Sequence, residues 1–350
     1  MLTNAQLDDL RALLERSQNP VFLYDNDADG LCSYVLLRRF LDRGKGIAVR
    51  THPDIDKGYA HKAQALGADL VVVLDCPFLG NDFVNELTEG GIPIVWIDHH
   101  FVDSPHYVHA NVSVFNPTRS EKPSEEPVTY WCYRLTQRVE DGWIALMGCI
   151  ADHYLPSFAE EFAKTCPDLW KKTVRQPFEA YYDTELGKLA HAIGFGLKDS
   201  VTHVVYLQNF LISCSNPRDL FQELESGSSF ARKYQDIKKR YDALLSEAHR
   251  GTYSSVVFYQ YGGTLSISAD LANELSYRYA PKPIVVAYVL GSVCTMSLRG
   301  SGVRALLETL LPSFANSKGG GHPDAVGARI NSEDLERFID SFTKLLSKRL

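Results

Sequence analysis

The 350-residue sequence lacks features that would place it in several other protein classes. Its seven cysteines are widely spaced and include no Cys-x-x-Cys pair, which excludes the common zinc ribbons and argues against a disulfide framework. No apolar run approaches the roughly 20 residues of a membrane helix, and the amphipathic stretch 1–20 has no signal-peptide core. The formal net charge of −7 gives no chain-wide basic surface for long nucleic acid. We therefore expect a reduced, cytoplasmic protein without a membrane segment.

The sequence does contain a regular alternation of apolar strands and amphipathic helices in its first part. Strands are predicted at 21–24, 47–51, 70–74, 92–97 and 112–115, and helices at 1–18, 31–43, 59–66 and 81–89. The nearly continuous Val, Ile and Leu content of the third and fourth strands is typical of a parallel sheet covered on both faces. This pattern predicts a doubly wound α/β domain.

The rest of the chain is predicted to form a helical connection and a second, smaller α/β region. A polar loop at 121–127 precedes helices at 128–139 and 143–150, residues 157–227 are mostly helical, and the spacing of apolar residues from 230 to 248 predicts one long helix. A hairpin is then predicted from 254–259 and 265–268, helices at 270–279 and 304–311, and strands at 284–290, 293–298 and 325–330. Asn331 or Ser332 is expected to cap a last helix. The predicted domains are residues 1–156, 157–250 and 251–350.

Carboxylates gather directly after the first predicted strand. Asp25, Asp27 and Asp29 alternate there, and Gly30 follows them. Open α/β sheets bind ligands at the carboxyl ends of their strands, and crowded carboxylates repel one another unless cations are bound. Since Asp, Asn and Gly are also ordinary turn formers, this run alone indicates a metal site and a solvated turn about equally.

Similar residues follow later predicted elements, at Asp75, at Asp98-His99-His100 and at Asp152. A single Asp after a strand often only caps the next helix. Several of them at one sheet edge, with two histidines, form a set of oxygen and imidazole ligands that can hold two divalent ions. Two such ions suit in-line hydrolysis of a phosphodiester. His52–Asp56 imitates a metal motif after the second strand, but we interpret it as a loop.

These motifs, in this order, resemble the four motifs of the DHH phosphoesterase superfamily. Towards the C-terminus, Ser297-Leu298-Arg299 and Gly319-Gly320-Gly321-His322 resemble the DHHA1 substrate domain of the same superfamily. The resemblance implies a doubly wound, mainly parallel DHH domain that a helical connector joins to a smaller α/β DHHA1 domain. Many short relatives have a histidine where this chain has Leu23. The use of Asp25 in its place resembles the RecJ-type branch.

The resemblance also implies a role for each motif residue. One metal ion would be held by Asp25, Asp27 and Asp75, and a second by Asp29, Asp75, His99 and Asp152. His100 would lie beside the phosphate, and Asp98 would orient the two histidines. The other end of the substrate would be bound by a set of residues near the C-terminus: Ser297, Arg299, Gly319, Gly320, Gly321 and His322. A glycine turn and a surface salt bridge of Arg299 are the structural alternatives for that set.

The implied function is a phosphodiesterase that uses two Mn²⁺ ions, with Mg²⁺ or another divalent ion left open. Its substrates would be linear dinucleotides, other short oligonucleotides, or single-stranded RNA or DNA attacked from a terminus. The acidic chain, without room for the OB-type module of full-length RecJ, favours short oligoribonucleotides, whereas the motif style favours longer single strands. Cyclic dinucleotides, 3′-phosphoadenosine 5′-phosphate, polyphosphate, a non-catalytic replication-associated protein and a homodimer are also left open.

Overall fold

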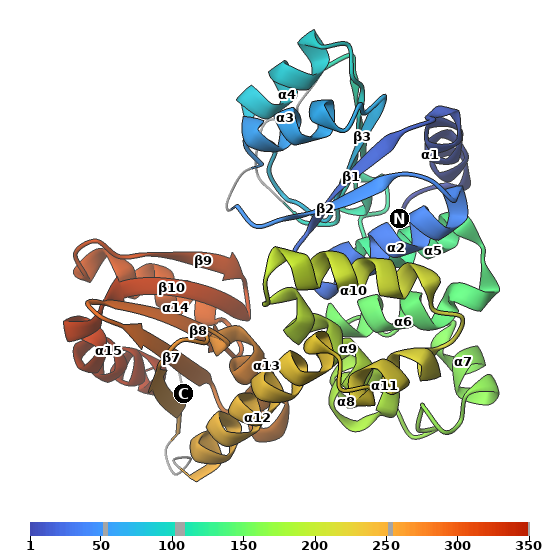
Figure 1. The fold of residues 1–350 in the computed structure, drawn as a ribbon. Coiled ribbons are helices and arrows are strands. Elements are labelled where there is room, and N and C mark those ends of the chain that lie inside the picture. The colour runs from blue at the N-terminus through green and yellow to red at the C-terminus, as the bar shows by residue number, and fades with distance from the viewer. Residues whose placement is uncertain (52–54, 102–108, 251–254, 349–350) are drawn as a thin grey trace. The chain divides into compact units, whose positions relative to one another are not determined.

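The computed structural model describes residues 1–51, 55–101, 109–250 and 255–348, which belong to two compact units, residues 1–234 and 235–350 (Figure 1). Of the predicted loop His52–Asp56, residues 52–54 lie outside the described residues. Asp56 lies inside them and caps the next helix, since its side chain accepts the N–H of Gly58.

The first unit is built on a five-stranded parallel sheet with the strand order β2-β1-β3-β4-β5. Its strands are β1 (Pro20–Asp25), β2 (Lys45–Val49), β3 (Leu70–Leu74), β4 (Ile94–Ile97) and β5 (Val112–Phe115). The chain passes from β1 to β2 on one side and returns to β3 on the other. The strand order therefore reverses between β1 and β3, which is the position where open α/β sheets bind ligands.

Helices cover both faces of this sheet, which confirms the doubly wound arrangement (Figure 1). On one face, α3 (Lys57–Ala65) and α4 (Asn81–Glu89) form a core with apolar strand residues such as Val21 and Val71. On the other face lie α2 (Ala28–Leu41), α5 (Val128–Thr136) and α6 (Gly142–Ala151), and α1 (Asn4–Arg16) packs on α5. Helix α2 begins three residues earlier than predicted because Asp27 caps it.

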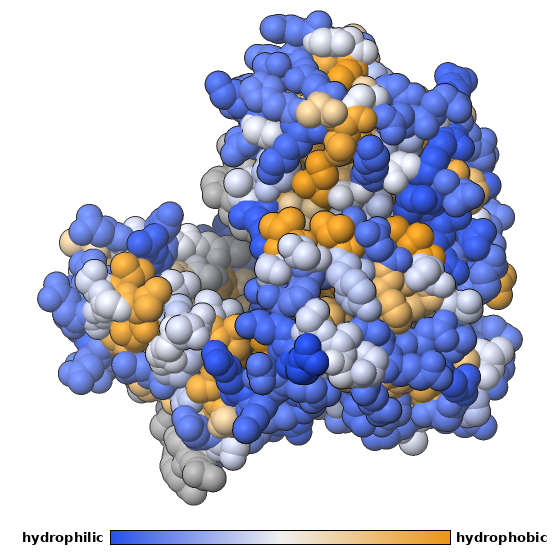
Figure 2. Space-filling view, viewed as in Figure 1, coloured by the Kyte–Doolittle hydropathy of each residue, from blue (hydrophilic) through white to orange (hydrophobic). Residues whose placement is uncertain are grey.

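The predicted helical region and the long helix are both present. Its helices are α7 (Ala159–Thr165), α8 (Pro177–Asp183), α9 (Glu185–Leu197), α10 (Val201–Ser213), α11 (Pro217–Glu225) and α12 (Ser229–Arg250). Figure 2 shows hydrophobic side chains gathered over α10, where Val201 is 65% exposed. A mostly apolar pocket of about 510 Å³ lies there, lined by β2, α3 and α10. Among the helices that the structure describes, none has the length and apolar character of a membrane span.

The second unit contains a mixed five-stranded sheet with the order β6-β7-β8-β10-β9. Its elements are β6 (Val257–Gly262), α13 (Ser268–Tyr279), β7 (Ile284–Leu290), β8 (Val293–Arg299), α14 (Val303–Leu310), β9 (Lys318–His322), β10 (Ala325–Asn331) and α15 (Leu335–Ser347). Strands β6 and β7 are parallel, and the other neighbouring pairs are antiparallel. Helices α14 and α15 contribute to one core with the sheet, and α13 packs on β7 and β8.

Two predictions for this unit are wrong. The hairpin of 254–259 with 265–268 does not form, because β6 pairs with β7 and the short segment after Gly263 leads into α13. The result is a β-α-β crossover in place of a hairpin. The predicted cap of the last helix makes no capping bond: Asn331 stands at the N-cap position of the 3₁₀ turn 332–334, which continues into α15, but its side chain accepts no hydrogen bond there.

Candidate metal centre

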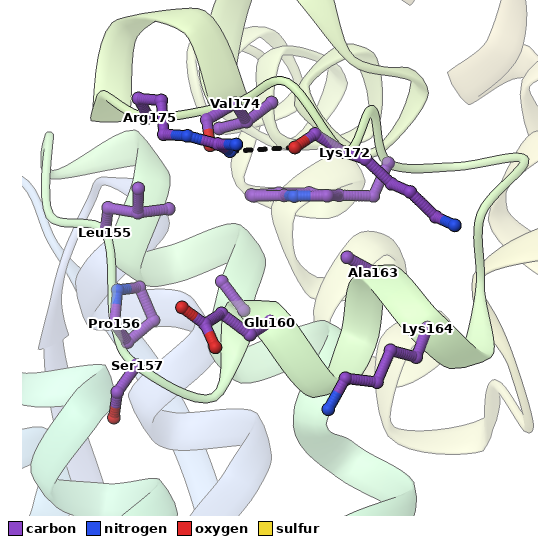
Figure 3. A pocket seen from close by; sticks show the side chains of 11 residues that line it. Leu155, Pro156, Ser157, Glu160, Ala163, Lys164, Lys172, Val174 and Arg175 are labelled. Carbon is purple, nitrogen blue, oxygen red and sulfur yellow. Dashed lines mark hydrogen bonds between the residues drawn. The ribbon is translucent and has the colours of Figure 1, made fainter.

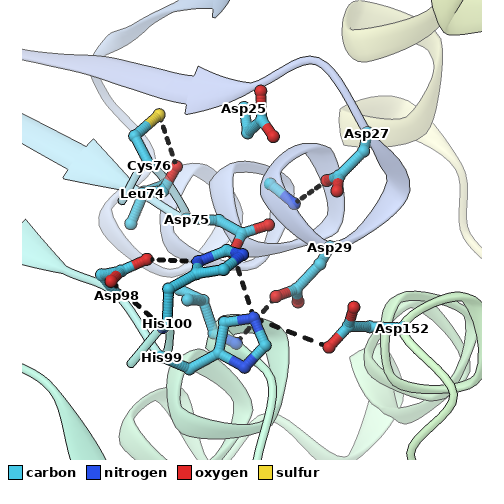
Figure 4. A network of polar contacts seen from close by, with 12 residues as sticks. Asp25, Asp27, Asp29, Leu74, Asp75, Cys76, Asp98, His99, His100 and Asp152 are labelled. Atoms are coloured by element: carbon cyan, nitrogen blue, oxygen red, sulfur yellow. Dashed lines mark hydrogen bonds and ion pairs between the residues drawn. The ribbon is translucent and has the colours of Figure 1, made fainter. Parts of the chain in front are cut away.

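Two neighbouring strands place carboxylates at the point where the strand order reverses. β1 ends at Asp25, and Asp75 directly follows β3. The N–H of Asp75 donates to the carbonyl of Ile97 at the end of β4, 2.9 Å away, which fixes its backbone at a φ of 60°. Ligand oxygens of Asp25, Asp27 and Asp75 all lie within 4.8 Å of one another (Figure 4). Asp25 therefore faces the other carboxylates, as expected for a ligand in place of a histidine.

The start of α2 holds the next two carboxylates. Asp27 caps the helix by accepting the N–H of Gly30 at 2.9 Å. Gly30 cannot carry a side chain, because a Cβ atom would lie 2.4 Å from the carbonyl oxygen of Asp25. Asp29 is 2% exposed, and its two oxygens accept the N–H groups of Val128 and Thr129 at 2.8 and 2.7 Å. It thus satisfies two free donors at the start of α5.

A second group of ligand atoms forms around His99. Its Nε2 lies 3.4 Å from Oδ1 of Asp75 and 3.6 Å from Oδ2 of Asp152, which follows the last residue of α6. Ligand atoms of Asp29, His99 and Asp152 lie within 4.8 Å of one another, and the same is true of Asp75, His99 and His100. The structure therefore brings all six predicted ligands together in three overlapping groups, of which two share Asp75 and two share His99.

Asp98 is buried and orients His100. One of its oxygens lies 2.8 Å from Nδ1 of His100, and the other accepts the backbone N–H of the same residue at 3.1 Å. The resemblance implies that Asp98 orients both His99 and His100. Within the described residues, Asp98 forms hydrogen bonds with His100 but not with His99. Nδ1 of His99 lies 3.4 Å from the carbonyl of Glu125 instead.

Asn116 is a site residue that the sequence prediction missed. Its side-chain NH₂ donates to Asp98 Oδ2 and to the carbonyl of His100, both at 3.1 Å. Its oxygen accepts the N–H and the hydroxyl of Thr118 at 2.9 and 2.7 Å, which fixes the orientation of the amide. Asn116 directly follows β5, as Asp75 follows β3 and Asp98 follows β4. Its place at a strand end was the signal that could have identified it.

The carboxylates of this site are crowded together without enough positive charge nearby to balance them, and the pKa values of several are raised. Burial raises the pKa of Asp25, and the neighbouring charge of Asp27 raises it further, to about 7. Burial and then the charge of Asp29 raise the pKa of Asp75 and of Asp152 well above the usual carboxyl value. Burial lowers the pKa of His100, but the hydrogen bond and charge of Asp98 outweigh it and raise that pKa to about 9.

The same site contains a buried oxygen that accepts no hydrogen bond in the described part of the chain, although Nε2 of His99 lies 3.4 Å from it. Oδ1 of Asp75 is fully buried and, within the described residues, has no hydrogen-bond donor. A buried polar atom in this state is costly and rare in proteins. Carboxylate oxygens and imidazole nitrogens are the ligands of Mn²⁺ and Mg²⁺. The residues present therefore fit divalent cations, which would supply both the missing charge and the missing partner.

The cysteines beside the motifs contribute packing. Cys32, Cys76 and Cys149 are buried, burial raises the pKa of each thiol, and all seven cysteines of the chain are free.

The predicted substrate residues of the second unit lie on three neighbouring strands. In the register of this sheet, Gly327 of β10 lies between Ser297 of β8 and Gly320 of β9. The glycine run is an exposed edge strand rather than a turn. At two positions of this strand the backbone itself requires glycine. At Gly319 a Cβ atom would lie 2.7 Å from a β10 carbonyl, and Gly321 has a φ of 140°.

Two residues of α13 hold this surface and were missed by the sequence prediction. The hydroxyl of Ser268 lies 3.0 Å from that of Ser297. Nε of Arg299 donates to the side-chain oxygen of Asn273 at 2.5 Å, and its Nη1 donates to the carbonyl of Leu298. Arg299 is therefore fixed by hydrogen bonds from its own unit.

Two family models match the chain. The model of the DHH family N-terminal domain matches residues 21–152, and the model of the DHHA1 domain matches residues 252–348. The chain belongs to the DHH/DHHA1 superfamily. The DHH match spans every predicted metal ligand, from Asp25 to Asp152, and the DHHA1 match spans the predicted substrate residues from Ser297 to His322.

Solved structures share the fold of this DHH/DHHA1 chain at low sequence identity. The DHH domain of a protein described as a member of a ribosomal protein family is 16% identical, with a TM-score of 0.66 and coverage of 98% of this chain and 89% of that one. RecJ from Thermus thermophilus in complex with Mn²⁺ is 14% identical, with a TM-score of 0.60 and coverage of 98% and 55%. The pGpG-specific phosphodiesterase PggH from Vibrio cholerae is 12% identical, with a TM-score of 0.50 and coverage of 94% and 99%.

This DHH/DHHA1 chain thus spans 55% of the length of the RecJ that it matches. Comparison with curated proteins finds no significant sequence match.

Proposed function

We propose that this chain is a phosphodiesterase that uses two Mn²⁺ ions and hydrolyses short oligonucleotides from a terminus. The observation that carries the proposal is the complete set of acidic and histidine ligands around the buried oxygen of Asp75, which accepts no hydrogen bond within the described residues. A binding protein without catalysis would have no need for so costly an arrangement of carboxylates. The complex of the similar RecJ with Mn²⁺ supports manganese as the metal.

The residues divide into ligands and groups that act on the substrate. One ion would be held by Asp25, Asp27 and Asp75, and the other by Asp29, Asp75, His99 and Asp152. When bound, the ions would neutralise phosphate charge and activate water as a nucleophile. In the metal-free site Asp98 outweighs burial and raises the pKa of His100 to about 9, and a protonated His100 would attract the phosphate. Ser297, Arg299 and the strand Gly319–His322 would bind the other end of the substrate.

Action on longer single strands is the second candidate. It is favoured by the position of Asp25, whose carboxylate lies with those of Asp27 and Asp75 as the RecJ-type form of the motif would require. Short substrates are favoured by the acidic chain, which has a net charge of −7. The seven free cysteines are consistent with the reducing cytoplasm that we propose as its location.

Substrate length separates these two candidates. We expect purified protein with Mn²⁺ to hydrolyse 5′-labelled RNA of two to five nucleotides at least about tenfold faster than strands near twenty, the upper range of single-strand site sizes. Labelled DNA, cyclic dinucleotides, 3′-phosphoadenosine 5′-phosphate and polyphosphate complete the series. Equal rates at all lengths would contradict the short-substrate proposal. Absence of hydrolysis of every compound with Mn²⁺ or Mg²⁺ would contradict an enzyme.

Replacing Asn116 by Ala should lower hydrolysis by about 10- to 100-fold, the usual effect of removing a group that orients a metal-site residue. The substitution removes the donor shared by Asp98 and the carbonyl of His100. We expect kcat to fall while the Mn²⁺ concentration for half-maximal activity changes little, because no predicted ligand is altered. Thr118→Val, which removes only one bond to Asn116, is the matched control. A variant with wild-type kcat would show that Asn116 has no positioning role.

A further inference from the structure

A second pocket lies in the helical part of the first unit and contains none of the predicted metal ligands. Its volume is about 730 Å³, within the range of about 300–1,000 Å³ typical of small-molecule sites. Figure 3 shows Lys172 and Arg175 on one side, and Ala163 and Lys164 of α7 on the opposite side. The loop 155–157 forms a further wall.

The charged lining of this pocket is mainly basic. Lys164, Lys172 and Arg175 line it against one acidic residue, Glu160, and the ammonium group of Lys164 is paired with Glu161 at 3.1 Å. Lys172 is exposed and forms no ion pair within the described part of the chain. Arg175 donates from Nη1 to the carbonyls of Lys172 and Val174 at 2.7 and 2.8 Å, which holds its guanidinium in place. A fixed guanidinium beside lysine ammonium groups is suited to a phosphate.

The remaining lining is flat and apolar. Trp170 lines the pocket although only 4% of its surface is exposed, and the ring of Phe162 packs against it edge-on, with centroids 6.1 Å apart. Pro156 and Val174 add buried apolar surface beside it. An apolar wall next to cations can contact a nucleobase while the cations bind its phosphate.

The pocket lies close to the metal centre along the chain. Leu155, in its wall, is three residues after Asp152, so their Cα atoms are at most about 11 Å apart. We propose that this pocket binds one nucleotide unit, with the base against the apolar wall of Pro156, Trp170 and Val174 and the phosphate among the basic side chains. If the proposed function holds, the unit belongs to the single strand whose scissile phosphate lies at the metal centre. A free nucleoside monophosphate has the same chemistry.

Binding of AMP to the full chain in EDTA, followed by calorimetry, tests the pocket without the metal centre. We expect saturable binding that Lys172→Glu weakens at least about tenfold, a factor that corresponds to about 1.4 kcal/mol. Lys171→Glu is the matched control, because Lys171 is also exposed but does not line the pocket. Ala163→Phe, which fills the pocket without changing its charge, should also abolish binding. Equal effects of the two lysine variants, or competition by inorganic phosphate as strong as that by AMP, would overturn the proposal.

Hydrolysis then identifies the source of the nucleotide. If it is part of the substrate, Lys172→Glu should raise KM for a five-nucleotide RNA at least about fivefold and leave KM for a dinucleotide within about twofold. If AMP binding is lost while KM is unchanged at every length, the pocket binds a free nucleotide. Because AMP binding needs no hydrolysis, failure of the proposed function leaves that result standing. If the pocket proposal is wrong, a Lys172→Glu enzyme that remains active will bind AMP with wild-type affinity.

Discussion

Replacing Asp75 by Asn is expected to lower Mn²⁺-dependent hydrolysis by at least about 10³-fold, because it removes the one carboxylate that belongs to two of the three groups of ligands. Asp75 is 2% exposed and has a φ of 60°, a conformation that Asn tolerates better than most residues. The amide has the size and shape of the carboxylate. The loss of activity would therefore report the loss of negative charge rather than a collapse of the site.

The same substitution is expected to increase the free energy of unfolding of the metal-free protein. Burial, followed by the charges of Asp29 and Asp27, raises the pKa of Asp75 in the folded state. A raised carboxyl pKa means that stability is lost as the pH rises through that pKa, because the ionised form is disfavoured in the fold. Asn has no such ionisation. The stabilisation of the variant in EDTA should thus grow as the pH rises above about 4, the ordinary carboxyl pKa that Asp75 has in the unfolded chain.

Hydrolysis assays with Mn²⁺ check the predicted loss of activity, and thermal denaturation with and without Mn²⁺ checks the predicted change in stability. Mn²⁺ at about 100 times its Kd should stabilise the wild type by roughly 2.7 kcal/mol, and the Asp75→Asn variant by much less. Hydrolysis within tenfold of the wild type would contradict a bridging role. A variant less stable than the wild type in EDTA at pH 8 would contradict the electrostatic explanation.

Asp69→Asn is the matched control, because it makes the same chemical change just before β3. Asp69 accepts the hydroxyl of Ser17 and the N–H groups of Gln18 and Asn19. Burial is the largest single influence and raises its pKa, but these hydrogen bonds together outweigh burial and lower the pKa below its ordinary value. Removal of this charge should therefore decrease stability by about 1 kcal/mol and leave hydrolysis unchanged. The two substitutions are expected to change stability in opposite directions.

The parallel sheet and the metal ligands could be predicted from the sequence because both follow from local patterns. A strand buried on both faces is a continuous apolar run, and β3 has the predicted limits of Leu70 and Leu74. Asp75 after β3, Asp25 at the end of β1 and Asp98 after β4 can all be read directly from the sequence. The start of α2 was less clear, because Asp27 serves as a helix cap within a run that also fits a turn.

Contacts between distant residues could not be predicted in the same way. Asp29 bonds to Val128 and Thr129, about a hundred positions later, and these bonds depend on how α5 packs against α2. Asn116 likewise reaches Asp98 only because β5 pairs with β4. The hairpin prediction failed because Gly262 and Gly263 are typical of a turn, whereas the true partner of β6 is reached only through α13.

Replacing Gly148 by Ala is expected to destabilise the fold by about 1–3 kcal/mol and to weaken Mn²⁺ binding. Gly148 lies in α6, where a Cβ atom would lie 2.4 Å from the hydroxyl oxygen of Thr129 and 2.9 Å from Cβ of Cys32. Thr129 in turn bonds the carboxylate and the carbonyl of Asp29. The added methyl group must therefore displace Thr129 and Asp29, or move α6 together with Asp152.

Gly194→Ala is the matched control, because it also places Ala at a helix interior glycine. In α9, a Cβ atom at Gly194 would meet nothing closer than the hydroxyl of Tyr181 at 3.9 Å. There the usual advantage of Ala over Gly should increase stability by about 0.5–1 kcal/mol. Denaturant unfolding in EDTA and titration with Mn²⁺ measure the two effects. A stable Gly148→Ala variant with wild-type Mn²⁺ affinity would show that α6 can move without displacing Asp152, so that the close packing of α6 does not position this ligand.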